Sequence, residues 1–206
     1  QAYSDTRCSR EREADMAGAE CRNEVEFLGK RLEKVGGGIA VIMVAATALG
    51  HLDHQFLVEV ASEAIGGGAD AALCGLCAEA GDAAQSAFLH GADVVYLAEH
   101  PSLAAYLAEP YARVIADAAR ALTPQAILLA ATTTGRDLAP RVASMLGTGL
   151  AADCTGLYVD SWNRHGVAYD GLLHMVRPAM AGGVLATCLC PEARPQMATV
   201  RPGVFE

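Results

Sequence analysis

The segment AILLAATTTGRDLAPRVASMLG (126–147) joins a continuous apolar run to an amphipathic stretch through a polar turn. The apolar run, AILLAAT (126–132), has the length and composition of a strand buried on both faces of a sheet. DLAPRVASMLG (137–147) has the apolar spacing of a helix, and Asp137 is placed to be its N-cap. A buried strand followed at once by a helix is typical of a parallel α/β fold.

The segments before this one repeat the alternation. Continuous apolar runs predict strands at 38–46, 69–76 and 92–100. Helical spacing predicts helices at 56–65, 80–91 and 106–122. The last of these helices is expected to begin near Pro110, because proline is favoured in a first helical turn. Apolar strands separated by helices predict a parallel sheet covered on both faces.

From residue 150 onward, short strand-like segments follow one another with no room for helices. These segments are LAADCTGLYVD (150–160), LLHMVRPAMA (172–181), GGVLATCLC (182–190) and MATVRP (197–202). We predict that they form an antiparallel or mixed extension of the same sheet. The predicted fold is α/β, a three-layer α/β/α Rossmann-like domain with a mainly parallel sheet and a β-rich antiparallel C-terminal extension. This domain is expected over 38–206, after a helical appendage over 1–37 that ends in a glycine linker.

Composition and charge exclude several classes of partner. The chain has 206 residues and a formal net charge of −9, without a cluster of lysine and arginine, which argues against nucleic-acid binding. No apolar run reaches the roughly 18 residues of a membrane span, so we expect no membrane insertion. The N-terminal segment is polar and has no apolar signal core, which predicts a cytoplasmic protein.

Seven cysteines, an odd number in apolar surroundings, favour reduced buried thiols over a disulfide framework. Cys74 and Cys77 form a C-x-x-C, but no second pair has matching spacing, so we expect no metal site. Cys188 and Cys190 alternate within a predicted strand and are expected to face the core together.

The polar turn after the strand at 126–132 is the best candidate for a binding site. In doubly wound sheets, ligands bind outside the C-terminal ends of the strands. Thr133 and Thr134 offer hydroxyl groups, and Gly135 allows close approach of the backbone to a ligand. Arg136 offers a planar, permanently charged fork for an anionic group. The alternative is a capped turn with one solvated arginine.

No motif predicts a catalytic residue. The sequence contains no P-loop, no G-x-G-x-x-G after the first strand and no nucleophile elbow. The triplet at 153–155 (DCT) offers a thiol, but no histidine is placed to activate it. Arg141 follows Pro140 early in the predicted helix, where its charge opposes the helix dipole, so we expect it to meet an acidic group.

Several long blocks together resemble one family. ATTTGRDLAPRVASMLGTGLAADCTGL (131–157) and HMVRPAMAGGVLATCLCPEARPQMATVRPGV (174–204) resemble the N-terminal domain of electron transfer flavoprotein alpha subunits. The matching blocks occur in the same order and with the same spacing as in this family, from about Gly68 to Phe205. It is closer to bacterial members associated with acyl-CoA dehydrogenases and electron bifurcation than to mitochondrial members.

The resemblance implies an electron carrier rather than a self-sufficient catalyst. Such an alpha subunit pairs with a beta subunit and carries electrons through FAD between a dehydrogenase, such as an acyl-CoA dehydrogenase, and a second acceptor. The sequence stops at RPGVFE (201–206), where the first domain of the family ends, so the FAD-gripping C-terminal domain is expected to be lacking and autonomous FAD binding is not expected.

The resemblance also assigns roles to the polar turn. Thr133, Thr134, Gly135 and Arg136 are expected to form the edge of a flavin site shared with the beta subunit, with Arg136 near the ring. Arg141, Arg177 and Arg201 are expected to serve structure or the interface with the beta subunit.

Two other interpretations stay open from the sequence. One is a stand-alone adenine-nucleotide-binding module with a fold like that of universal stress proteins, although no glycine-rich phosphate loop is present. The other is a scaffold domain that binds a partner but no cofactor.

Overall fold

A computed structural model describes strands at 3–5, 41–46, 71–77 and 94–99, residue 103, and residues 105–179 and 183–205. The predicted helices at 56–65 and 80–91 lie outside these residues. Of the predicted appendage over 1–37, only Tyr3–Asp5 is described, and it forms strand β1. The boundary between an appendage and a domain at residue 38 therefore stays a prediction.

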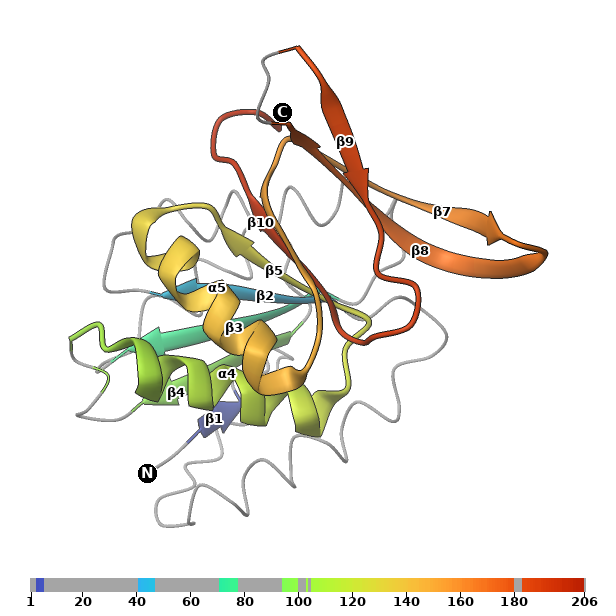
Figure 1. The fold of residues 1–206 in the computed structure, drawn as a ribbon. Helices are drawn as coiled ribbons and strands as arrows, with labels where there is room; N and C mark the ends of the chain where they lie inside the picture. The colour runs from blue at the N-terminus through green and yellow to red at the C-terminus, as the bar shows by residue number, and fades with distance from the viewer. Residues whose placement is uncertain are drawn as a thin grey trace.

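The centre of the fold is a seven-stranded sheet in the order β1-β4-β3-β2-β5-β10-β6 (Figure 1). After β1, its strands are β2 (Val41–Ala46), β3 (Ala71–Cys77), β4 (Val94–Glu99), β5 (Ala126–Ala130), β6 (Leu150–Cys154) and β10 (Gln196–Val200). All neighbouring pairs are parallel except β1 with β4, which is antiparallel. The apolar runs at 38–46, 69–76, 92–100 and 126–132 therefore predicted strands correctly.

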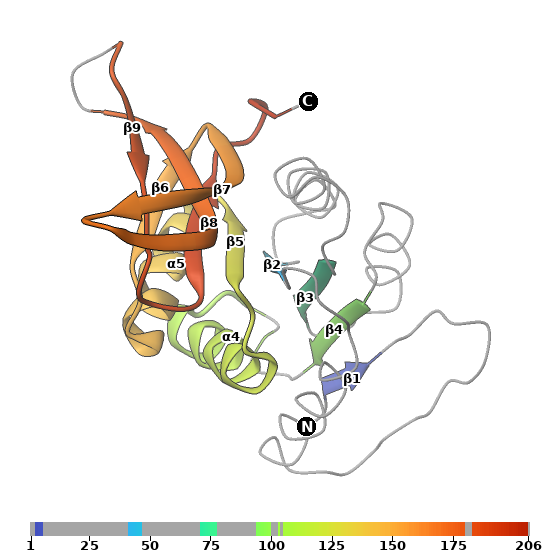
Figure 2. The ribbon, with the colours of Figure 1, turned by 90° about the vertical axis from the view of Figure 1, so that its right-hand side faces the viewer.

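Two helices pack together on one face of this sheet, α4 (Ala108–Leu122) and α5 (Thr133–Leu146) (Figure 2). Ile127 and Leu129 of β5 belong to the same buried cluster as residues of both helices. Leu128, which points to the opposite face, is 1% exposed, so that face of β5 is also covered. Burial of β5 on both sides explains its continuous apolar sequence and confirms the predicted α/β class.

Helix α5 begins at Thr133, so the predicted start at Asp137 was wrong. The N-cap is Thr132, whose side-chain hydroxyl accepts a hydrogen bond from the Gly135 amide at 3.2 Å. The polar turn (133–136) is therefore the first turn of the helix. Asp137 is an exposed residue of the same helix, one position further on. Helix α4 begins at Ala108, so Pro110 lies in its first turn, where no amide is needed for the helical ladder.

The predicted β-rich end is present, but it does not extend the central sheet as a whole. Strands β7 (Gly156–Arg164), β8 (Val167–Pro178) and β9 (Leu185–Cys188) form a separate antiparallel sheet, which stands beside the body in Figures 1 and 2. The turn between β7 and β8 has positive φ at both His165 and Gly166, as in the turns that close two-residue hairpins. This tight turn makes the two strands pair with each other, whereas β6 and β10 join the central sheet in parallel.

The cysteines of the C-terminal end differ from the prediction. Cys188 is the last residue of β9, Cys190 lies beyond the strand, and both are half-buried rather than in the core. Cys190 instead lies near the loop that leads into β10, with its Sγ 3.8 Å from the Ala193 carbonyl oxygen. Cys74 and Cys77 fall in β3, and their side chains lie outside what the structure describes.

Candidate functional site

The polar turn lies where the strand order of the central sheet reverses. From β2 the chain adds β3 and β4 on one side, and β5 pairs with β2 on the other side. Such a reversal opens a crevice at the C-terminal ends of the two strands, which is where ligands of open α/β sheets bind. Helix α5 starts directly after β5, so its first turn stands at this edge.

The four residues predicted for the site divide into two kinds. Thr133 and Arg136 are exposed, whereas Thr134 is 7% exposed and Gly135 is buried. A Cβ atom at Gly135 would lie 1.9 Å from the carbonyl oxygen of Ala130. Gly135 therefore allows α5 to approach the end of β5, which is a packing role, and the ligand contact expected from the sequence stays a prediction.

Arg136 is held by partners from two other segments. Its Nε donates to the Ala131 carbonyl oxygen at 2.8 Å, and its Nη2 donates to Asp153 Oδ1 at 3.0 Å. The same carboxylate accepts from Arg201, with Nε 3.1 Å from Oδ1 and Nη2 bonded to Oδ2. We call Arg136, Asp153 and Arg201 the arginine cluster: Arg136 lies in the first turn of α5, which follows β5, Asp153 lies near the end of β6, and Arg201 directly follows β10.

The charges of this cluster favour the ionised carboxylate. The hydrogen bond from Arg201 holds the pKa of Asp153 below its usual range, against the opposing effect of burial, and the charges of Arg136, Arg201 and Arg177 add to this. The same bond raises the pKa of Arg201. Arg177, expected to serve structure or the interface with the beta subunit, is half-buried, and its charge acts on Asp153. The three positive charges of Arg136, Arg201 and Arg177 outnumber the one negative charge of Asp153, so this end of the sheet carries an excess of positive charge.

The thiol beside Asp153 is not suited to nucleophilic catalysis. Cys154 is fully buried in β6, and burial raises the pKa of its thiol to about 12. A thiol that stays protonated near neutral pH is a poor nucleophile. Among the residues that the structure describes, no group of three or more histidine, cysteine or acidic side chains could hold a metal ion.

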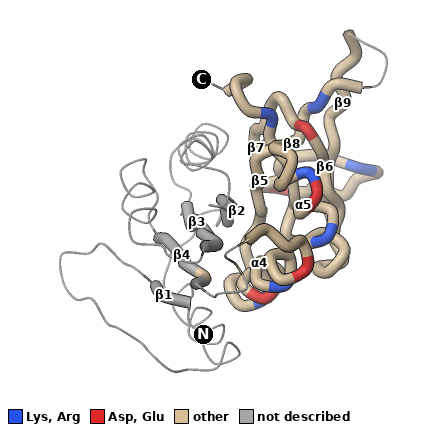
Figure 3. The backbone as a smooth tube through the Cα atoms, turned by 90° about the vertical axis from the view of Figure 1, so that its left-hand side faces the viewer, with Lys and Arg blue, Asp and Glu red and all other residues tan. Residues whose placement is uncertain are grey.

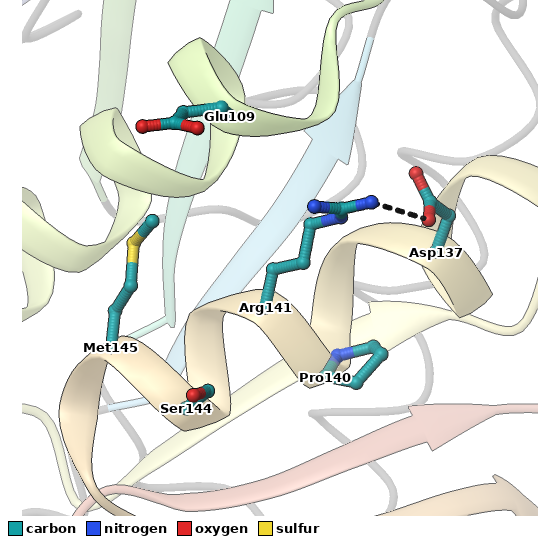
Figure 4. A pocket seen from close by; sticks show the side chains of 6 residues that line it. All are labelled: Glu109, Asp137, Pro140, Arg141, Ser144 and Met145. Carbon is teal, nitrogen blue, oxygen red and sulfur yellow. Dashed lines mark ion pairs between the residues drawn. The ribbon is translucent and has the colours of Figure 1, made fainter.

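A second charged region lies between α4 and α5, and we call it the α4–α5 groove (Figure 4). Its lining residues are Glu109, Asp137, Pro140, Arg141, Ser144 and Met145. Arg141 Nη2 is 3.5 Å from Asp137 Oδ1, so the acidic partner expected for this arginine is present within its own helix. Asp137 also accepts a hydrogen bond of 2.7 Å from the Tyr106 hydroxyl. Burial and this bond raise the pKa of Tyr106 to about 12.

Charges along the two helices are interleaved rather than gathered by sign (Figure 3). On α4, Arg113 pairs with Glu109 at 2.7 Å and Arg120 with Asp117 at 2.7 Å. Both pairs are between residues one turn apart, and they are exposed. Neither described helix is long and apolar enough to cross a lipid bilayer.

Asp153 was not recognised from the sequence as part of the site. It appeared there only in the triplet at 153–155, beside the thiol of Cys154. Its φ of +63°, in a strand whose register with β10 is irregular, marks it as unusual. Aspartate tolerates this left-handed conformation better than most residues, but the sequence does not show that the conformation is required.

Comparison with known proteins assigns the chain to a family. Residues 54–206 match the family described as the electron transfer flavoprotein domain. The chain belongs to this family. The alpha subunit of the electron transfer flavoprotein of Thermoanaerobacterium thermosaccharolyticum is 51% identical over 116 residues, which are 56% of this chain and 33% of that protein.

Two further relatives carry other names. Protein FixB of Rhizobium meliloti is 49% identical over 124 residues, which cover 60% of this chain and 33% of FixB. The acryloyl-CoA reductase electron transfer subunit beta of Anaerotignum propionicum is 42% identical over 132 residues, which cover 57% of this chain and 36% of that subunit. The chain spans about a third of the length of these curated relatives.

Proposed function

We propose that this chain is an electron transfer flavoprotein alpha-type subunit, or a part of one, which acts only together with a beta-type subunit. In this role it helps to carry electrons through FAD between a dehydrogenase, such as an acyl-CoA dehydrogenase, and a second acceptor. Membership of the electron transfer flavoprotein domain family supports this proposal. So do relatives named as electron transfer flavoprotein and acryloyl-CoA reductase electron transfer subunits.

The observation that carries the proposal is the placement of Arg136. Its side chain is 57% exposed, and two of its guanidinium nitrogens are tied to the protein, so the rest of the fork can face a ligand. Thr133, which is exposed, and the first amides of α5 belong to the same helical turn as Arg136. Cationic and donor groups of this kind fit an anionic ring or phosphate at the edge of the sheet.

In this proposal, flavin supplies the redox chemistry when it is bound, and the chain supplies a fixed positive charge. Reduction adds negative charge to a flavin ring, and a nearby guanidinium group stabilises that charge. Arg136 would therefore make the flavin easier to reduce. Thr134 and Gly135, which are buried, would shape the flavin site indirectly, because they set the position of the first turn of α5 against β5.

The test is co-expression of this chain with an electron transfer flavoprotein beta-type subunit, followed by absorbance spectra and potentiometric titration of the purified complex. We expect flavin in the complex. We also expect Arg136→Ala to lower its reduction potential by roughly 30 mV, which for two electrons corresponds to about 1.4 kcal/mol. Arg141→Ala, on the same helix but in the α4–α5 groove, is the matched control and should leave the potential unchanged.

Other results would contradict this function in different ways. A stable complex without flavin would indicate a scaffold domain that binds a partner alone. Adenine nucleotide released from the isolated chain on denaturation would indicate a nucleotide-binding module instead. Equal potentials for wild type and Arg136→Ala would remove Arg136 from the flavin site.

A further inference from the structure

The carboxylate of Asp153 lies between two guanidinium groups and binds both. Arg201 bonds to both carboxylate oxygens, and Arg136 Nη2 donates to Oδ1 at 3.0 Å. The Asp153 side chain is 26% exposed, against 57% for Arg136 and 40% for Arg201. The carboxylate is therefore the most enclosed member of the arginine cluster, and the bidentate bond with Arg201 fixes its orientation.

The backbone around Asp153 is fixed as well. Its amide donates to the Thr199 hydroxyl at 2.8 Å, and the Arg201 amide donates to the Cys154 carbonyl oxygen at 2.9 Å. Thr199 is 1% exposed in β10, between β5 and β6. Asp153 thus takes its position from β6 and β10 rather than from α5, which carries Arg136.

Arg136 has one local anchor and one distant anchor. The local anchor is the Ala131 carbonyl oxygen, which binds Nε at 2.8 Å. A single bond at Nε fixes one point of the fork and leaves the rest free to turn. The bond to Asp153 fixes a second point, and a planar group held at two points has a defined orientation.

We infer that Asp153 is a positioning residue that orients the guanidinium group of Arg136 toward the strand-end edge, with Arg201 holding the carboxylate in place. The consequence for a flavin rests on the function proposed above, but the orientation itself does not. The geometry predicts that loss of the Asp153 carboxylate leaves Arg136 anchored only at Nε.

The first test needs no flavin and uses the full chain. Nitrogen-15 NMR measures the exchange of the Arg136 Nε–H with water, and the signal is assigned by its loss in Arg136→Lys. We expect Asp153→Asn to speed this exchange several-fold. Asparagine also tolerates a positive φ, so the backbone conformation should survive. Asp160→Asn, an exposed carboxylate on β7, is the control and should leave the exchange unchanged.

A second variant keeps the inference testable if Asp153→Asn fails to fold. Arg201→Lys retains the charge but lacks the planar fork that makes two parallel bonds to the carboxylate, so it should speed the exchange of Arg136 Nε–H by a smaller factor. Unchanged exchange in whichever of the two variants folds would overturn the inference.

The second test uses the complex with a beta-type subunit. If Asp153 acts through Arg136, Asp153→Asn changes the flavin potential in the wild-type background, and most of that change disappears in Arg136→Gln. An equal change in both backgrounds would mean that Asp153 acts directly, and would overturn the inference. Faster exchange of Arg136 Nε–H in a chain whose complex with the beta-type subunit holds no flavin would support the orientation and contradict the proposed function.

Discussion

The arginine cluster and the α4–α5 groove each contain an arginine of helix α5 that is paired with an aspartate. Arg136 binds Asp153 of β6, which is bound in turn by Arg201 after β10. Arg141 binds Asp137, one turn away on its own helix, at 3.5 Å. The side chains of the two arginines are similarly exposed, 57% and 52%. Exposure therefore does not distinguish them, whereas the origin of the partner does.

A partner on a strand, such as Asp153 of β6, orients a helical arginine relative to the sheet. A partner on the same helix orients an arginine relative to that helix, and Asp137 is bonded beyond α5 to the Tyr106 hydroxyl rather than to a strand of the sheet. The difference explains why we place a ligand near Arg136 and none near Arg141, although the groove is also charged. The comparison teaches that the guanidinium group of a helical arginine is oriented relative to the sheet when its acidic partner belongs to a strand of that sheet.

The largest effect is expected where α5 meets β5, because both arginines stand on this helix. Gly135→Ala places a Cβ atom 1.9 Å from the Ala130 carbonyl oxygen, so the helix must shift. We expect the free energy of unfolding to fall by about 3 kcal/mol in urea titration. Gly149→Ala is the control, because its nearest contact would be Cys190 Sγ at 3.6 Å. A loss for Gly135→Ala as small as that of the control would contradict the close-packing role.

A smaller effect is expected for Asp153→Asn, and it depends on pH. The pKa of Asp153 is lowered in the folded protein. The stability that its carboxylate contributes is therefore complete above the unfolded pKa of about 3.9 and is lost as pH falls through the folded pKa. We expect the variant to be less stable by about 1–2 kcal/mol at pH 7, with the difference shrinking below about pH 4.

Denaturant titrations of wild type and variant across this pH range measure the effect. Asp137→Asn breaks the pair within the helix instead and should cost about 0.5 kcal/mol at pH 7. Equal losses for Asp153→Asn and Asp137→Asn would remove the energetic distinction between the two regions.

The smallest effect concerns the groove. Tyr106→Phe removes the hydroxyl that donates to Asp137, an exposed bond that contributes about 0.5 kcal/mol. Because the pKa of Tyr106 is raised to about 12, the stability that it adds is complete below pH 10 and decreases as pH rises from 10 to 12. Ultraviolet titration of tyrosinate, compared with Tyr106→Phe, checks this; ionisation of Tyr106 near pH 10 would contradict it.

The sequence predicted β5 well because this strand is buried on both faces and therefore apolar throughout. It placed the start of α5 too late, since threonine and glycine are weak helix formers and Asp137 resembled a cap. Thr132 caps the helix instead, and Gly135 is required by a carbonyl group of β5. The cap at Thr132 and the requirement for glycine at 135 depend on the backbone geometry between β5 and α5, which the sequence does not show.

The arginine cluster was only half predictable. Arg136 is recognisable from its place after a strand, but its partner depends on the order of β5, β10 and β6 in the sheet. The last strand of the chain enters between two earlier strands and brings Arg201 to Asp153. Local periodicity carries no information about such an insertion. The separation of the β7–β8–β9 sheet was missed for the same reason.

The tilted ring pair on the hairpin of β7 and β8 gives the protein an optical reporter. Trp162 is the one tryptophan in the sequence, and its ring lies 5.9 Å from that of Tyr169, with Arg164 6.0 Å from its centre. Its fluorescence therefore follows the antiparallel sheet, while far-ultraviolet dichroism follows the helices. Melting curves from the two signals would coincide if both sheets unfold as one cooperative unit and would separate if the hairpin detaches first.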